Sequence, residues 1–278
     1  MIQKKIYLYE NNDRVYMDVF LCDDAVEYSH HTRPFLLVCP GGGYGFLSAR
    51  EAEPIARRYM GYGFNTAILH YTIAGDPDGM TDKLSGLPKP LIEVAKSTSI
   101  IRENASEWNT DGEKIAVVGF SAGGHLAGSS GVFAQKPELI ERIGNNNNRP
   151  NAMVLAYPVI TGVGASHPGS FKNLLDSPTP SQEKLAEYSL EKNVTPNCPP
   201  TFIFHTFEDK TVPVSNAICM AEALANNNVY FEAHILPYGN HGLSLASGEV
   251  LVQENAYATR WVDWSVEWLK KTLNIFNA

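Results

Sequence analysis

Ser121 has the sequence surroundings of a reactive serine. It lies in Gly119-Phe120-Ser121-Ala122-Gly123, directly after the apolar run 114–118. A Gly-x-Ser-x-Gly segment that ends a buried strand and opens a helix exposes the serine hydroxyl on a sharp, rigid turn, where glycines avoid Cβ clashes. The backbone N–H of Ala122 then faces the same space. The alternative interpretation is an ordinary strand-to-helix turn without chemistry.

A serine hydroxyl needs a base to remove its proton, and a histidine oriented by a carboxylate performs that task. His241 is the favoured base, because it lies in a Gly-flanked loop, 238–242, just after the last predicted strand. Three other downstream histidines lie on the following helix or inside strand-like runs and are expected to be structural: His125, His205 and His234.

The orienting carboxylate is expected in the loop after the predicted strand 201–206. The segment 207–213, Phe-Glu-Asp-Lys-Thr-Val-Pro, offers two adjacent candidates. Consecutive side chains of an extended loop point apart, so only one of them can face His241. We predict Asp209, which stands in an Asp-x-x-Val-Pro pattern whose proline can begin the next helix. Glu208 is expected to be a solvated neighbour.

A glycine-rich loop is a candidate oxyanion hole. The apolar run 36–40 leads into Gly41-Gly42-Gly43-Tyr44-Gly45. Glycines let main-chain N–H groups approach a substrate closely, and such donors stabilise the anion formed when an acyl group is attacked. The loop has neither the lysine of a P-loop nor the spacing of a dinucleotide fingerprint, which disfavours a phosphate cradle.

Together these motifs resemble the acetyl xylan esterase-like branch of the α/β-hydrolases. The resemblance extends from about residue 35 to about residue 270 and rests on these segments: 40–44, 47–54, 108–125, 156–161, 195–206, 209–213 and 239–242. It implies a catalytic triad in the chain order of that fold, made of Ser121, Asp209 and His241.

The resemblance also implies an oxyanion hole built from the N–H groups of Ala122, Gly42 and Gly43. Tyr44 is a further candidate donor and substrate contact. Pro40 stands where many esterases carry the histidine of His-Gly-Gly-Gly. The choice of the donating N–H in this loop therefore stays open.

Strands and helices alternate along the chain, which predicts a single α/β-hydrolase domain over residues 1–278. Strands are expected near 4–9, 15–22, 35–40, 66–71, 115–120, 152–157, 201–206 and 230–236. Helices are expected near 50–61, 88–107, 122–135, 214–227 and 255–273. The expected fold is a mostly parallel central sheet with an antiparallel N-terminal edge and helices on both faces.

Residues 161–199 are the least regular part of the chain and are predicted to form a short, polar cap over the site. His167 in this segment contacts either substrate or solvent. Near the other end, Trp261, Trp264 and Trp268 share one helical face. Their spacing favours core packing, or a subunit contact in a homo-oligomer, over carbohydrate stacking.

The 278 residues are 44% hydrophobic and 19% charged, with a net charge of −8 and a pI near 5.5. This acidity disfavours nucleic acid or an anionic membrane as partner, because both bind clustered Lys and Arg. The start lacks an apolar signal core and no run approaches the length of a membrane helix, which favours the cytoplasm. Four cysteines without metal or redox spacing indicate reduced thiols, and we expect neither a metal nor a cofactor: Cys22, Cys39, Cys198 and Cys219.

These features predict a serine carboxylesterase that removes acetyl or similar short acyl groups, with a small-molecule ester or an acetylated sugar as substrate. A peptidase or amide hydrolase with the same triad and a non-catalytic member of the fold are the alternatives. The large extra domain of prolyl peptidases has no room in this chain. A xylanase needs two carboxylates flanking a glycosidic bond, and the sequence shows no convincing second acid.

Overall fold

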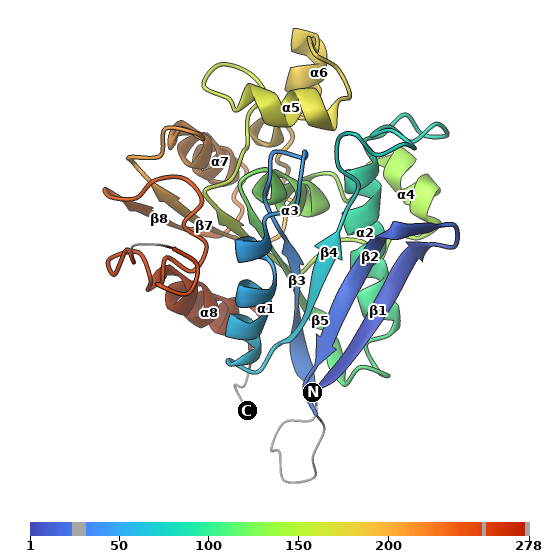
Figure 1. Ribbon diagram of the computed structural model, residues 1–278, viewed down its shortest axis with the longest axis vertical. Helices are drawn as coiled ribbons and strands as arrows, with labels where there is room; N and C mark the ends of the chain where they lie inside the picture. The colour runs from blue at the N-terminus through green and yellow to red at the C-terminus, as the bar shows by residue number, and fades with distance from the viewer. Residues whose placement is uncertain (24–31, 252–253, 276–278) are drawn as a thin grey trace.

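One eight-stranded sheet forms the centre of the molecule in a computed structural model that describes residues 1–23, 32–251 and 254–275 (Figure 1). The strand order is β1-β2-β4-β3-β5-β6-β7-β8. β1 pairs antiparallel with β2, and β2 with β4, whereas every later pair is parallel. The strands are β1 (Ile2–Tyr9), β2 (Asn12–Leu21), β3 (Arg33–Cys39), β4 (Asn65–His70), β5 (Thr110–Phe120), β6 (Ala152–Ala156), β7 (Thr201–Thr206) and β8 (Phe231–Leu236). The predicted mostly parallel sheet with an antiparallel N-terminal edge is confirmed.

Helices cover both faces of this sheet, as predicted (Figure 1). The core on one face includes side chains of α1 (Glu53–Met60) and α8 (Trp261–Thr272). The core on the other face includes side chains of α2 (Lys89–Glu103), α3 (Ala122–Val132) and α7 (Ser215–Asn226). The central strands are therefore buried between two helical layers, whereas the edge strands β1 and β8 are largely exposed. Reactive side chains on the central strands must lie at the strand ends.

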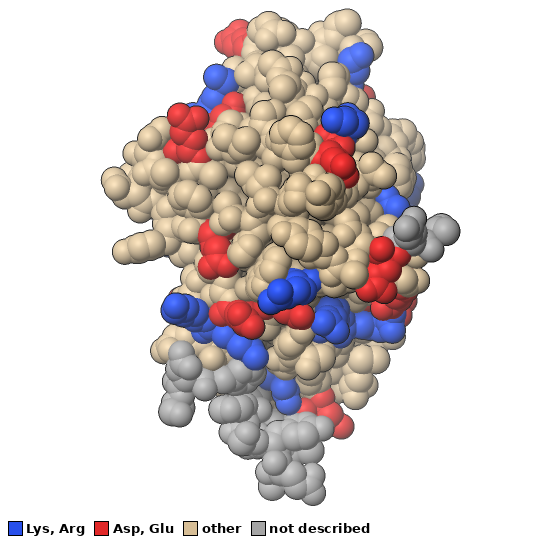
Figure 2. Space-filling view, turned by 90° about the vertical axis from the view of Figure 1, so that its left-hand side faces the viewer, with Lys and Arg blue, Asp and Glu red and all other residues tan. Residues whose placement is uncertain are grey.

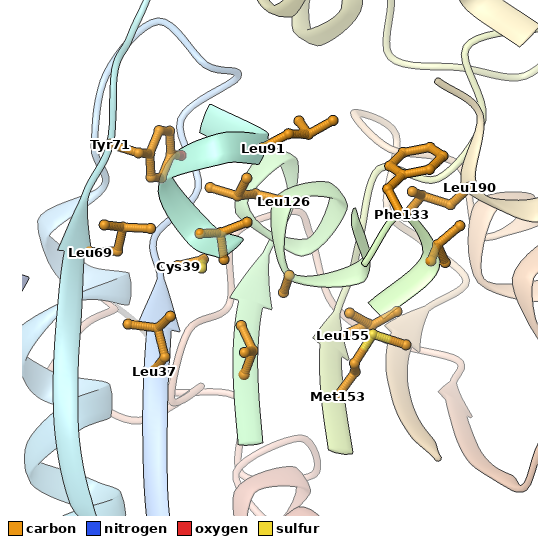
Figure 3. Close-up of a cluster of buried hydrophobic side chains, with 14 of the residues drawn as sticks. Leu37, Cys39, Leu69, Tyr71, Leu91, Leu126, Phe133, Met153, Leu155 and Leu190 are labelled. Carbon is orange, nitrogen blue, oxygen red and sulfur yellow. The ribbon is translucent and has the colours of Figure 1, made fainter. Parts of the chain in front are cut away.

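β3 shows why the central strands are rich in apolar residues. Leu36 and Val38 belong to the core under α1 and α8, whereas Leu37 and Cys39 point to α2 and α3 (Figure 3). Side chains alternate between the faces of a strand, so a strand covered on both sides needs apolar residues at every position.

Short helices outside the predicted ones make the main difference from the expected layout. They are α4 (Pro137–Ile143), α5 (Pro168–Leu174), α6 (Gln182–Glu187) and the 3₁₀ turn η2 (Leu190–Lys192). A further 3₁₀ turn, η1 (Ala49–Glu51), lies at the start of the predicted helix 50–61. The prediction of an irregular 161–199 segment was therefore wrong in part, because α5 and α6 lie inside it. They begin at local caps: the side chains of His167 and Ser181 accept backbone N–H groups of the first helical turn.

The tryptophan face of α8 packs against the sheet, which confirms the core-packing interpretation. Trp261 is fully buried and stacks on Phe204 with ring centroids 5.2 Å apart. Trp264 stacks on His234 at 4.6 Å. These rings fill the space between α8 and the strands β7 and β8.

Within the described ranges, no helix is long and apolar enough to span a bilayer, and no three His, Cys, Asp or Glu side chains are grouped as metal ligands. The four cysteines are free thiols. On the face that Figure 2 shows, Lys and Arg are interspersed with Asp and Glu rather than gathered in one basic patch.

The turns after β3 and β5 approach each other so closely that glycine is required between them. A Cβ atom added to Gly123 would lie 2.2 Å from the Cys39 carbonyl oxygen and 2.3 Å from that of Pro40. A Cβ added to Gly119 would lie 2.0 Å from the Gly123 carbonyl oxygen. The start of α3 is therefore held directly against the end of β3.

Gly123→Ala should destabilise the fold by at least about 3 kcal/mol, because two backbone carbonyls would have to move. Gly112→Ala is the matched control: its added Cβ would meet only ordinary contacts, the nearest at 3.6 Å. Its effect should stay within about 0.5 kcal/mol. Chemical denaturation of both variants measures the difference, and a stable Gly123→Ala protein would contradict the close approach.

Candidate active site

Ser121 occupies a strained position between the last residue of β5 and the first residue of α3. Its φ of 54° and ψ of −120° lie outside the regions that most residues adopt. Two backbone hydrogen bonds to the neighbouring β6 end hold it: its N–H donates to the Ala156 carbonyl, and its carbonyl accepts from the N–H of Val159. The turn thus presents the hydroxyl at the carboxyl end of the sheet, as the sequence pattern predicts.

The structure brings Ser121, His241 and Asp209 into one hydrogen-bonded chain. His241 Nε2 lies 2.8 Å from Ser121 Oγ, and His241 Nδ1 lies 2.6 Å from Asp209 Oδ2. The three residues follow β5, β8 and β7, so they come from separate strand ends. With Nδ1–H donated to the carboxylate, Nε2 of a neutral imidazole is free to accept the serine proton.

Both carboxylate oxygens of Asp209 accept hydrogen bonds, which favours its ionised form. Its side chain is buried, and Oδ1 accepts the backbone N–H groups of Thr211 and Val212, each at 2.9 Å. Burial alone would raise the pKa of Asp209, but the hydrogen bond and charge of His241 and the two N–H groups outweigh it and lower the pKa. A lowered pKa means that the ionised form stabilises the fold above the usual carboxyl range and that this stabilisation is lost as pH falls through the folded-state pKa.

Glu208 is exposed, and the carboxylate bonded to His241 Nδ1 is that of Asp209. Glu208 Oε2 accepts the backbone N–H of Gly239 at 3.1 Å. Glu208 is therefore more than the expected solvated neighbour, because it fastens the start of the loop that carries His241.

The other histidines have the structural partners expected of them. His125 is fully buried between the Tyr44 hydroxyl and the Tyr188 carbonyl, both at 2.8 Å, and burial lowers its pKa to about 4. His205 Nδ1 accepts the backbone N–H of Thr206, and His234 contacts Glu232 and Trp264. None of the three lies in the Ser121 chain.

The glycine-rich loop after β3 has the backbone geometry of a donor site. Gly42 and Gly43 have φ values of 127° and 63°, which glycine adopts without strain. Among the described residues, the N–H groups of Gly42, Gly43 and Tyr44 donate to no protein acceptor. Ala122 is the first residue of α3, and first-turn N–H groups have no partner within a helix. These donors could all bind an anion near Ser121.

The side chain of Tyr44 packs into the core and does not face the site. The ring is 1% exposed, packs edge-on against Tyr71, and gives its hydroxyl to His125. An aromatic ring gains more by burial in this core than by exposure, and its hydroxyl finds a partner there. Only the backbone N–H of Tyr44 remains as a candidate contact.

The cap segment reaches the glycine loop. Asn173 of α5 donates to the Gly43 carbonyl at 2.8 Å, and a Cβ added to Gly43 would lie 3.9 Å from His167 Cε1 and from Ser170 Oγ. His167 Nδ1 is engaged by Ser170. Polar groups of α5 therefore border the loop, in the place expected for the cap (Figure 1).

No role was assigned from the sequence to three residues beside the site, although two of them lie in segments that carry the family resemblance. Phe46 is 61% exposed and lies next to Gly42. Glu51 and Tyr157 are buried behind the loops and bind each other, with Tyr157 Oη 2.8 Å from Glu51 Oε1. The two residues are 106 positions apart in the chain. Their pairing therefore could not be predicted from local sequence patterns.

Comparison with known proteins gives consistent matches. The BD-FAE family model matches residues 17–224. The chain is 38% identical over 221 residues to endo-1,4-beta-xylanase B of Butyrivibrio fibrisolvens, covering 78% of this chain and 33% of that protein. It is 30% identical over 213 residues to acetylxylan esterase of Xylanibacter ruminicola, covering 75% of this chain and 40% of that protein. The chain thus spans well under half the length of these relatives.

A solved structure matches nearly the whole chain. It is the acetyl ester-xyloside bifunctional hydrolase of Caldicellulosiruptor lactoaceticus, with a TM-score of 0.81 and 31% identity, covering 98% of this chain and 97% of that one. The predicted α/β-hydrolase fold and the acetyl xylan esterase-like resemblance are confirmed by these matches.

Asp209→Asn should lower kcat by about 10³-fold or more, because the amide cannot balance an imidazolium and favours the wrong tautomer. Glu208→Gln is the matched control: its amide oxygen can still accept the Gly239 N–H, so kcat should change by less than about 3-fold. Steady-state kinetics on a p-nitrophenyl ester test both. The reverse ranking would make Glu208 the orienting group.

Proposed function

The chain belongs to the BD-FAE family. On this basis we propose that it is a serine carboxylesterase, which removes acetyl and similarly short acyl groups from carbohydrate hydroxyls. The observation that carries the proposal is the continuous hydrogen-bonded chain from Asp209 through His241 to Ser121. Beside it lie backbone N–H groups that have no acceptor in the part of the protein that the structure describes.

The geometry suits acyl transfer in two steps. Ser121 Oγ attacks the ester carbonyl carbon while His241 Nε2 takes the hydroxyl proton, and the carbonyl oxygen becomes an anion bound by N–H groups of Ala122 and the Gly42–Gly43 loop. The intermediate collapses, the C–O bond to the alcohol breaks, and His241 returns its proton to the departing alkoxide. Water then repeats the sequence against the acyl-serine, which releases the carboxylic acid and restores Ser121.

Asp209 takes no proton in this scheme. It stays ionised, orients His241 through Nδ1, and stabilises the imidazolium that forms in each step. The lowered pKa of Asp209 supports this role, because the carboxylate remains charged when His241 gains a proton.

The substrate class rests on the relatives and on the borders of the site. The names of two matched proteins include acetylxylan esterase and acetyl ester-xyloside hydrolase. The polar residues His167, Ser170 and Asn173 border the glycine loop in this chain, and they suit an alcohol rich in hydroxyl groups better than a long alkyl chain.

A peptidase or amide hydrolase remains the alternative with the same residues, since Ser121 and His241 would serve it equally. Glycoside hydrolysis requires a free pair of carboxyl groups. Asp209 is hydrogen-bonded to His241, and Glu208 accepts the Gly239 N–H, so these two carboxyl groups do not form a free pair.

We expect kcat/KM to fall from p-nitrophenyl acetate through butyrate to octanoate. Each buried methylene gains about 0.8 kcal/mol. The side chains of His167, Ser170 and Asn173 beside the glycine loop are polar and give no such gain to a long acyl chain. Acetylated xylo-oligosaccharides should release acetate without new reducing ends, and Ser121→Ala should release none.

Two results would contradict this proposal. A maximum at octanoate would show a long apolar channel, and new reducing ends that depend on the protein would show glycosidase activity. Hydrolysis of a p-nitroanilide at a rate above that of the matching ester would favour the amide hydrolase alternative.

A further inference from the structure

Glu51 is a buried carboxylate that the reaction scheme leaves without a role. It is 2% exposed and lies at the end of η1, behind the glycine loop. Oε2 accepts the backbone N–H of Gly41 at 2.9 Å, and Oε1 accepts the Tyr157 hydroxyl at 2.8 Å. Burying a carboxylate is costly unless its oxygens are hydrogen-bonded, and hydrogen bonds to a charged acceptor are stronger than neutral ones.

The Glu51 oxygen that accepts the Gly41 N–H lies close to the turn that carries Ser121. A Cβ added to Gly41 would lie 2.6 Å from Glu51 Oε2 and 3.1 Å from the Ser121 Cβ. The bond from Glu51 therefore fixes the first residue of the glycine loop at its point of contact with Ser121. Gly42 and Gly43, whose N–H groups have no acceptor among residues 1–23, 32–251 and 254–275, follow directly in the chain.

The other Glu51 oxygen is hydrogen-bonded to Tyr157, which lies beside His241. The Tyr157 hydroxyl accepts the backbone N–H of Ser244 at 2.8 Å, three residues after His241. The Tyr157 ring stands edge-on to the His241 ring, with centroids 5.2 Å apart. Ser244 is also held by the Trp261 indole N–H, which donates to its carbonyl at 2.8 Å.

Glu51 thus links the loop that offers oxyanion donors to the loop that carries the base. We propose that Glu51, acting through Tyr157, is a positioning residue that sets the distance between the oxyanion donors and His241. This inference rests on the proposed esterase function. Glu51 touches no substrate; its two oxygens hold two loops that must keep a fixed separation while the tetrahedral intermediate forms.

The expected effect is on the transition state rather than on substrate binding. Misplacement of reacting groups by about 1 Å costs about 10²-fold in rate. Glu51→Gln keeps the size of the side chain but removes its charge. Its amide oxygen can accept the Gly41 N–H, and its NH₂ group cannot accept the Tyr157 proton, so the Tyr157 hydroxyl must turn to accept from this group instead of donating to a carboxylate. Tyr157→Phe keeps the ring beside His241 and removes only the hydroxyl that joins Glu51 to Ser244.

The test compares these two variants with a matched control, Tyr59→Phe. Tyr59 is also fully buried, and its hydroxyl lies 2.6 Å from Ser265 Oγ, between α1 and α8 and outside the site. With p-nitrophenyl acetate, Glu51→Gln and Tyr157→Phe should lower kcat by at least about 10-fold and change KM by less than about 3-fold. An alkyl boronic acid, which mimics the tetrahedral intermediate, should bind more weakly by a similar factor. Tyr59→Phe should lower the melting temperature and leave kcat unchanged.

The double variant adds a second criterion. If Glu51 acts through Tyr157, the two substitutions break one connection, and the double variant should be no slower than the slower single variant by more than about 2-fold. Active-site titration with a fluorophosphonate corrects every rate for the folded fraction, and Tyr157→Phe remains a test if Glu51→Gln does not fold.

Folded variants that keep the wild-type kcat would overturn the inference while leaving the esterase function intact. The same holds if kcat and KM change together, or if Tyr59→Phe loses kcat as strongly. A wild-type chain that hydrolyses no ester would instead contradict the proposed function, and the positioning role with it.

Discussion

The close contact between the turns after β3 and β5 determines how the glycine loop and Ser121 are placed relative to each other. These strands are parallel neighbours, and their turns meet with no space for a Cβ atom at Gly41 or Gly123. The distance between the glycine loop and the Ser121 turn is therefore set by backbone packing, which is stiffer than side-chain packing. Oxyanion stabilisation depends on donors that stand in place before charge develops, and in the proposed esterase function this contact would supply such preorganisation. The strained φ of Ser121 is kept by the same packing.

The remaining groups are joined to this contact by a small number of hydrogen bonds. His241 and Asp209 lie on loops after β8 and β7, so their alignment with Ser121 depends on how those loops are fastened. Glu208 holds Gly239, Tyr157 holds Ser244, and Asp209 is held by the N–H groups that follow it. The α5 segment is fastened to the glycine loop through Asn173. A rigid centre with separately anchored loops allows the cap to vary without disturbing the reacting groups.

The sequence predicts those parts of the molecule that depend on local sterics. The sharp turn at the serine requires the glycines of Gly-x-Ser-x-Gly. Strands that are covered on both faces require long apolar runs. The positions of Ser121, Asp209 and His241 at strand ends follow from these two rules. The pairing of Glu51 with Tyr157 depends instead on how η1 lies over the end of β6, which no local pattern encodes. The burial of the Tyr44 side chain has a similar cause, because only the tertiary structure brings His125 within reach of its hydroxyl. The short helices α5 and α6 begin at single caps in a polar stretch that lacks helical periodicity.

Covalent labelling with a fluorophosphonate, followed by peptide mass spectrometry, tests the central claim most directly. The phosphonyl group reports which hydroxyl is activated by a neighbouring base and placed beside oxyanion donors. The structure predicts labelling of one residue, Ser121, with loss of ester hydrolysis in proportion, and no labelling of Ser121→Ala. Labelling at another serine, or full ester hydrolysis by a chain whose Ser121 stays unmodified, would contradict the account.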